Sequence, residues 1–166
     1  MEMTPEKASN LARFLIAQFE DEIKTTRNVL AAVPEDRADY RPDPKSKSAL
    51  ELAAHVAAAD AFFLGAVIKG SFERPATSPA AGLKTPAEVV AFYDANVPEA
   101  IQKVKELSGE QLAQPVTAFS RSLPNVMFLN VGLKHGVHHR GQLSAYLRPM
   151  GAKVPSIYGS SADSDQ

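Results

Sequence analysis

The sequence predicts a single all-α domain, a four-helix bundle with long connections between the helices. Four long segments repeat apolar residues at helical spacing, Pro- and Gly-rich stretches separate them, and little of the chain alternates as a strand would. With 166 residues, 45% of them hydrophobic, the chain is large enough to bury one core. We expect this domain to span residues 1–158 and the small, polar residues 159–166 to form a flexible tail.

The first helix is expected over residues 5–33. Thr4 has the residue type of an N-cap, and Pro5 suits the first helical position. Pro34 ends the helix, and two further prolines in residues 34–47 mark a connection. The apolar positions that recur at helical spacing are Leu11, Leu15, Phe19, Ile23 and Leu30.

The second helix begins near Ser48 and ends at Gly70. Ser48 and Glu51 have the spacing of a capping box, in which each side chain accepts a hydrogen bond from the other residue's amide. From residue 50 to 68 the segment is apolar except for Glu51, His55 and Asp60. A helix that is apolar nearly all round is expected in the interior of the bundle.

The third helix follows a loop over residues 71–84. Thr85 and Glu88 again have capping-box spacing, and the apolar pattern continues to Leu107. Pro98 lies inside this pattern and is expected to kink or split the helix. Residues 108–124 are ambiguous, with one short helix over residues 109–113 followed by an irregular or extended piece.

The fourth helix is expected from Asn125 to Arg148, where Pro149 and Gly151 end it. Its interior face is predicted to contain Phe128, Val131, His135, His139, Gln142 and Tyr146.

Composition restricts the function. The chain has no cysteine, which excludes disulfides and thiolate catalysis and limits a zinc site to nitrogen and oxygen ligands. A net charge of -1 argues against nucleic acid as the main partner. The N-terminus lacks the order of a signal peptide, and no uninterrupted apolar run approaches the length that spans a bilayer. We therefore expect a cytoplasmic protein that binds neither nucleic acid nor membrane.

The four histidines fall into two short segments. His135 and His139 are four residues apart and share one helix face, and His55 lies on another apolar helix. Together they can form a three-nitrogen site that leaves a divalent metal ion an open position, as catalytic sites do. The alternative is that these are ordinary histidines bonded to backbone or water. His138 lies about 100° round the helix from His139, so we expect it to face substrate or solvent, or to support a ligand.

Gln142 and Glu51 are candidates to support the ligands. Gln142 is on the face of His135 and His139 and could orient a ligand or a bound water, or simply be a polar bundle residue. Glu51 could hold His55, or serve only in the capping box. No serine or cysteine has a partnered base, so the catalytic group itself would be a metal-bound water or a substrate thiolate.

Two motifs also resemble a known family. The segment His135–Leu143 resembles the last helix of the DinB-like family (the DinB/YfiT superfamily), and Ser48–His55 resembles the start of its second helix. Tyr40–Pro42 and Val154–Gly159 are similar to the family as well, so the resemblance covers nearly the whole chain.

The resemblance implies a four-helix bundle that forms a homodimer and holds one divalent metal ion per chain, nickel or zinc, on His55, His135 and His139. Characterised relatives include S-transferases that use low-molecular-weight thiols such as bacillithiol or mycothiol, and a thiol-dependent isomerase. The family name reflects induction by DNA damage and does not imply DNA binding.

These observations lead to one main hypothesis and three alternatives. The main hypothesis is a metal-dependent, thiol-dependent S-transferase acting on a small molecule, with the metal activating a thiolate. A metal-dependent hydrolase using metal-bound hydroxide is the first alternative. A non-catalytic metal- or small-ligand-binding stress-response protein is the second, and a bundle without metal the third. For the homodimer, Phe62, Phe63 and Val67 suggest an apolar patch larger than one core can bury.

Overall fold

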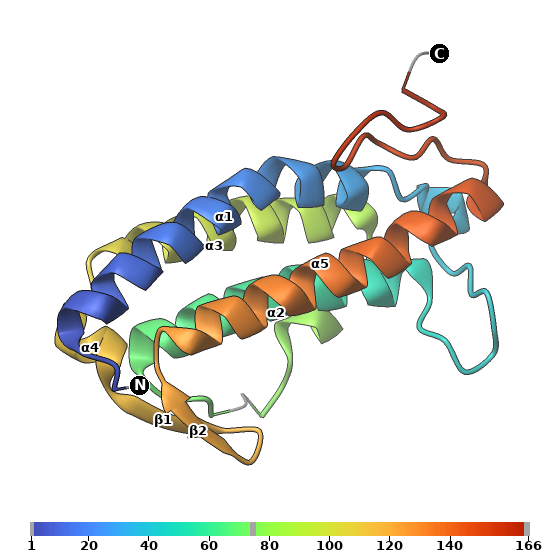
Figure 1. Cartoon of the computed structure of the whole chain (residues 1–166). Coiled ribbons are helices and arrows are strands. Elements are labelled where there is room, and N and C mark those ends of the chain that lie inside the picture. Colours follow the sequence, from blue (N-terminus) through green and yellow to red (C-terminus); the bar gives the residue numbers. More distant parts are fainter. Residues whose placement is uncertain (1, 74–75, 165–166) are drawn as a thin grey trace.

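Four long helices build the molecule, which confirms the predicted all-α four-helix bundle (Figure 1). The structure is a computed structural model, and it describes residues 2–73 and 76–164. The long helices are α1 (Pro5–Ala31), α2 (Ala49–Lys69), α3 (Pro86–Lys105) and α5 (Met127–Leu147). The shorter elements are η1 (Glu35–Arg37), η2 (Pro79–Gly82), α4 (Gly109–Ala113), β1 (Pro115–Ala118), β2 (Arg121–Pro124) and η3 (Arg148–Met150).

The predicted start signals begin three of these helices. Thr4 Oγ1 accepts a hydrogen bond from the amide of Lys7 at the start of α1. At the start of α2, Ser48 Oγ accepts from the Glu51 amide at 3.1 Å and Glu51 Oε2 accepts from the Ser48 amide at 2.8 Å. These side chains satisfy amides that the helix itself leaves without partners, which fixes where each helix begins.

Pro98 does not split α3, so that part of the prediction is wrong. The helix is continuous from Pro86 to Lys105 with the proline inside it. Val97, Ile101 and Val104 are all buried around this position. Their packing against the rest of the bundle outweighs the backbone hydrogen bond that the proline cannot make.

The ambiguous stretch before α5 forms the short helix α4 and an antiparallel hairpin of β1 and β2. Ala118 pairs with Arg121, so the turn consists of Phe119 and Ser120 alone. Both turn residues have positive φ, at 52° and 61°. The hairpin projects from the end of the bundle where α5 begins (Figure 1).

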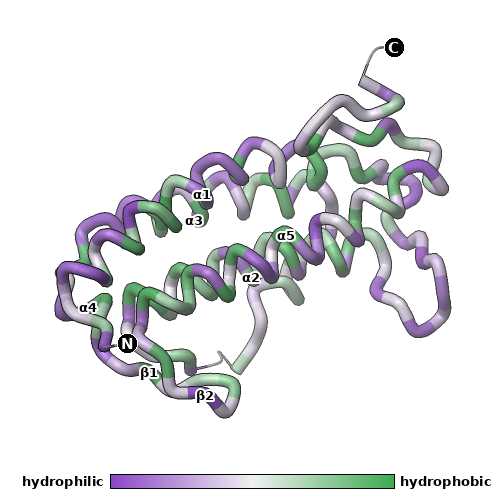
Figure 2. Tube along the Cα trace, in the orientation of Figure 1, coloured by the Kyte–Doolittle hydropathy of each residue, from purple (hydrophilic) through white to green (hydrophobic). Residues whose placement is uncertain are grey.

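Helix α2 is the most buried element and packs against α3 and α5. Figure 2 shows apolar residues along almost its whole length. By length and composition it could cross a membrane, but 67% of its most apolar window is buried against the rest of the chain. That burial is expected of the core helix of a bundle.

The buried face of α5 differs from the predicted one. It contains Phe128, as predicted, together with Leu129, Gly132, Gly136, Arg140, Leu143 and Leu147, whereas Gln142 is exposed and His135, His139, Val131 and Tyr146 are only partly buried. A Cβ atom on Gly132 would lie 2.7 Å from Cβ of Phe63, and one on Gly136 would lie 2.6 Å from Oδ1 of Asp60. The two glycines therefore let α5 approach α2 closely, and the histidines lie beside this contact.

The residues expected to form a dimer patch lie mostly inside the chain. Phe63 is 5% exposed and Val67 is fully buried, while Phe62 is partly buried. These three residues thus give no exposed apolar patch.

The segment that follows η3 runs back along the bundle. Asp163 pairs with Arg148 and accepts a hydrogen bond from the amide of Val154. Flexibility of residues 159–166 stays a prediction, and residues 165–166 lie outside the described residues.

Candidate metal centre

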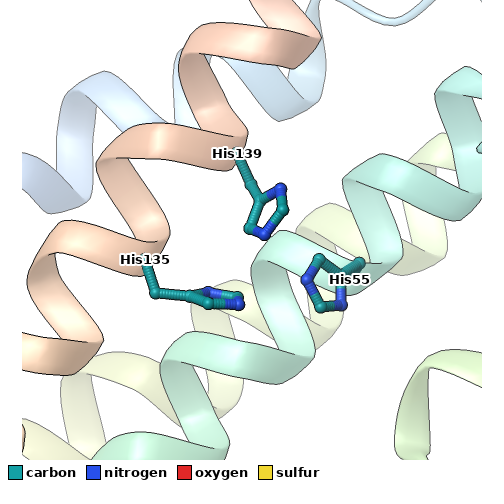
Figure 3. A group of neighbouring side chains, drawn as sticks. All are labelled: His55, His135 and His139. Carbon is teal, nitrogen blue, oxygen red and sulfur yellow. The ribbon is translucent and has the colours of Figure 1, made fainter.

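Three imidazole rings point toward one another from two helices: His55 from α2, and His135 and His139 from α5 (Figure 3). One ring nitrogen from each lies within 4.8 Å of the others. The ring centroids are 5.0 Å apart for His55 and His135, 4.5 Å for His55 and His139, and 4.4 Å for His135 and His139. The sequence placed all three residues on inward-facing positions, and the close contact of α2 with α5 brings them together.

The surroundings of the imidazole rings favour their neutral form, which is the form that binds metal. Burial and, to a smaller extent, the neighbouring His139 together lower the pKa of His55 and of His135 to about 4. Both rings are therefore neutral near pH 7 and keep a lone pair for an ion. The Nδ1 atom of His135 is buried without a hydrogen-bond partner among the described residues. A ligand to this cluster would relieve the cost of that orphaned nitrogen.

Gln142 supports one of the rings. Its Oε1 atom lies 2.7 Å from Nδ1 of His139 and accepts a hydrogen bond from it. This bond places the proton on Nδ1 and leaves the lone pair on Nε2, as an outer hydrogen bond does for metal-bound histidines. Gln142 is thus placed to orient a ligand, one of the two roles considered for it.

The other two candidates lie outside the cluster. Glu51 is engaged by the capping box and by Arg41 at 2.9 Å, and these contacts lower its pKa. His138 is exposed, and the centroid of its ring lies 4.8 Å from that of His139. Among the described residues, the cluster therefore contains three histidines and no fourth histidine, cysteine or carboxylate.

A cavity of about 560 Å³ opens beside the histidines, and we call it the aromatic cavity. It is lined by His55, Ala58, Ala59, Ala61, Phe62, Phe63, Ser78, Pro79, Phe92, Asn96, Phe119 and His135. Two imidazoles of the cluster thus form part of its wall, and apolar side chains form most of the rest.

A second cavity of about 500 Å³ lies on another side of His55, and we call it the lysine cavity. Lys47 and Lys84 line it, together with Glu51, whose charge is paired with Arg41. His55 and Ser78 line both cavities. The histidine cluster therefore lies where an apolar space and a positively charged space meet.

Sequence reasoning missed the most deeply buried charge, Arg140, which is 1% exposed. Its guanidinium pairs with Glu22, donates to Thr26 Oγ1 at 3.1 Å and donates to the Tyr158 hydroxyl at 2.6 Å. That hydroxyl in turn donates to Glu22 at 2.7 Å. The network joins α1, α5 and the segment after η3.

The sequence marked Asp60 only as a polar exception in an apolar helix and predicted no role for its carboxyl group. Asp60 is 4% exposed, and its Oδ2 accepts a hydrogen bond from Tyr93 at 3.4 Å, whereas Oδ1 has no partner among the described residues. Burial raises the pKa of Asp60 to about 7, against a smaller lowering by the Tyr93 hydroxyl and by Arg140.

Comparison with known proteins agrees with this architecture. The sequence model of the DinB family matches residues 7–165, so the chain belongs to the DinB family. An uncharacterized protein of Bacillus subtilis strain 168, YjoA, is 27% identical over 140 residues, which cover 82% of this chain and 89% of that protein.

Solved structures share the fold. The DinB-like protein YjoA of B. subtilis superposes with a TM-score of 0.70 at 22% identity, covering 89% of this chain and 99% of that one. A DinB-like protein of Bacillus cereus ATCC 10987 gives 0.69 at 22% identity, covering 95% and 100%. A histidine-to-alanine mutant of the mycothiol-dependent maleylpyruvate isomerase gives 0.53 at 19% identity, covering 84% and 60%.

Proposed function

We propose that this DinB-family protein binds one divalent metal ion, nickel or zinc, through His55, His135 and His139. We propose further that it is a metal-dependent enzyme that transfers a thiol to a small electrophile. The observation that carries the proposal is the convergence of three imidazoles from two helices at the junction of two cavities.

The donor set fits such an ion. The two rings with lowered pKa are neutral near pH 7, Gln142 fixes the proton of the third, and His135 has a buried nitrogen without a partner. With three neutral nitrogens, a bound divalent ion keeps its full charge and an open position, and it lowers the pKa of a thiol or water that occupies that position.

The two cavities favour a reaction of two substrates. Lys47 and Lys84 offer positive charge to the acidic groups of a thiol cofactor on one side of His55. The aromatic cavity offers a separate apolar space for the acceptor. The mycothiol dependence of the isomerase that shares the fold agrees with a thiol as one reactant. Hydrolysis needs only water and one substrate, so it does not require two separate binding spaces.

Metal content is the first test. Protein purified without a histidine tag is analysed for elements beside His139→Ala and beside His138→Ala, a matched exposed histidine outside the cluster. We expect about one ion per chain in the wild type and in His138→Ala, and loss in His139→Ala. Absence of metal from all three proteins after incubation with nickel and zinc would contradict the proposal.

The thiol is tested with charge reversals. Lys47→Glu combined with Lys84→Glu should raise KM for an acidic thiol such as mercaptosuccinate roughly fivefold, the scale of exposed charge pairs. KM for the neutral thiol 2-mercaptoethanol should not change. Lys24→Glu, on α1 and in neither cavity, is the control. Turnover of esters without any thiol would instead favour hydrolysis.

We also propose a cytoplasmic homodimer as the working form. Light scattering on the purified protein at micromolar concentration measures its mass directly. A mass of one chain under these conditions would contradict the dimer.

A further inference from the structure

We propose that the aromatic cavity binds an uncharged small molecule containing an aromatic ring, and that Phe119 on the hairpin turn determines this specificity. The role of that molecule as the acceptor in the reaction rests on the proposed function. Its binding rests only on the cavity, and it is expected with or without metal.

The cavity wall excludes charged ligands. Among the described lining residues there is no lysine, arginine, aspartate or glutamate. Its polar groups are the two imidazoles, Ser78 and Asn96, and the Asn96 amide already donates to the carbonyl of Phe92 at 2.8 Å. In the metal-free cavity, a carboxylate or phosphate would lose its hydration without gaining a paired charge, which strongly disfavours such ligands.

The apolar part of the wall favours rings. The centroids of Phe62 and Phe63 are 5.8 Å apart, and those of Phe63 and Phe119 are 6.1 Å apart. Phe63 also lies 5.4 Å from the ring of His135. Such tilted and edge-on arrangements at 5–6 Å are the ones that aromatic groups prefer. A bound aromatic ring can make the same kind of contact with these phenylalanines, and it would then lie near the ring of His135.

Phe119 is held at the cavity by an unfavourable backbone. It and Ser120 form a two-residue hairpin turn with both φ values positive, for which Asn and Gly are the favoured residues. A phenylalanine in this region is rare and is strained by roughly 1–3 kcal/mol. Its ring packs against Phe63 and Phe72, at 6.1 and 6.0 Å between centroids, yet the side chain remains 51% exposed. A ligand in the cavity would cover part of this exposed apolar surface.

The volume sets the size of the ligand. About 560 Å³ lies within the range of small-molecule sites and accommodates two or three rings. With His55 and His135 in the wall, a reactive atom on such a molecule would lie next to the proposed metal site.

The test uses two probes that differ by one charge. N-phenyl-1-naphthylamine is neutral, and 1-anilinonaphthalene-8-sulfonate is the same molecule with a sulfonate. Titration of the folded, chelator-treated protein, followed by fluorescence, should show one site for the neutral probe and at least about tenfold weaker binding of the sulfonate. Equal or tighter binding of the sulfonate would overturn the proposal.

Two variants locate the probe. Phe119→Ala should weaken binding of the neutral probe roughly tenfold, through loss of about 50 Å² of apolar contact. Phe14→Ala, which removes a phenylalanine that is 62% exposed on α1, should have no effect and serves as the control. Ala61→Trp should block the cavity and abolish binding while the circular dichroism spectrum of the folded helices is retained. Unchanged binding in both Phe119→Ala and a folded Ala61→Trp would overturn the proposal.

The titration with the neutral probe is made with both chelator-treated and nickel-loaded protein. Binding of the neutral probe to both forms supports the aromatic cavity even if the metal proposal fails. Metal binding by the three histidines without any probe binding would keep the proposed function and reject this inference.

Discussion

Replacing the buried carboxyl group of Asp60 with an amide is expected to stabilise the protein at neutral pH. Asp60 is 4% exposed, it has one weak hydrogen bond from Tyr93, and one of its oxygens has no partner among the described residues. Asp60→Asn preserves the shape and the acceptor for Tyr93, and removes the charge that would otherwise form in the core.

The magnitude follows from the pKa, which burial raises from 3.8 to about 7. Between these two pH values the folded state keeps a proton that the unfolded state has lost. Stability therefore falls as pH rises through this window, by about 1.4 kcal/mol per pH unit. The total is about 4 kcal/mol, present in full below pH 3.8 and lost above about pH 7.

Urea unfolding followed by circular dichroism measures this effect from pH 4 to pH 8. The free energy of unfolding of Asp60→Asn minus that of the wild type should be near zero at pH 4 and about 4 kcal/mol at pH 8. Subtraction cancels the contribution of other titrating groups, and the exposed Asp21→Asn should differ from wild type by less than about 0.5 kcal/mol throughout. A difference that does not change with pH, or a destabilised Asp60→Asn at pH 8, would refute the reasoning.

Three further predictions concern α5 and its partners. Gly136→Ala should destabilise the protein by roughly 1–3 kcal/mol because the new methyl group meets Asp60. A methyl group on Gly141 would have nothing within 4 Å, so Gly141→Ala should be neutral or stabilising by up to about 1 kcal/mol. Thermal unfolding of the two variants beside the wild type measures the difference. Tyr158→Phe removes one hydrogen-bond partner of the buried Arg140 guanidinium and should lower the free energy of unfolding in urea by about 1–3 kcal/mol. An unchanged midpoint of the urea transition would show that this hydroxyl contributes nothing to stability. Gln142→Leu should weaken zinc or nickel binding about 10- to 100-fold in a competition with a chelating dye. The same metal affinity in the variant and the wild type would show that Gln142 does not orient His139.

The helices could be predicted because their start signals are local. Thr4, Ser48 and Thr85 act within three residues of themselves, and each caps its helix as expected. The capping box predicted for Thr85 and Glu88 forms only in part, because the Glu88 carboxylate accepts from the Lys84 amide and not from the Thr85 amide. The continuity of α3 through Pro98 could not be predicted in this way. It depends on the packing of Val97 and its neighbours against other helices, which no local pattern contains.

The candidate cluster was visible in the sequence because imidazoles are few and their spacing on a helix is fixed. The buried face of α5 was not visible, because it is formed by glycines and an arginine as well as by leucines. A hydrophobicity pattern predicts that Arg140 lies on the surface. Its burial depends on Glu22 and Tyr158, which are 118 and 18 residues away along the chain.

The close approach of α5 to α2 has a consequence for the proposed metal site. Gly132 and Gly136 set the separation of the two helices, and therefore the distance from the ring on α2 to the two rings on α5. A larger residue at either position would move the helices apart and widen the donor set without changing any ligand. The size of ion that the site prefers would then be determined by two residues that have no side chain and do not touch the ion. Substitution at these positions would be a way to retune the site toward larger ions.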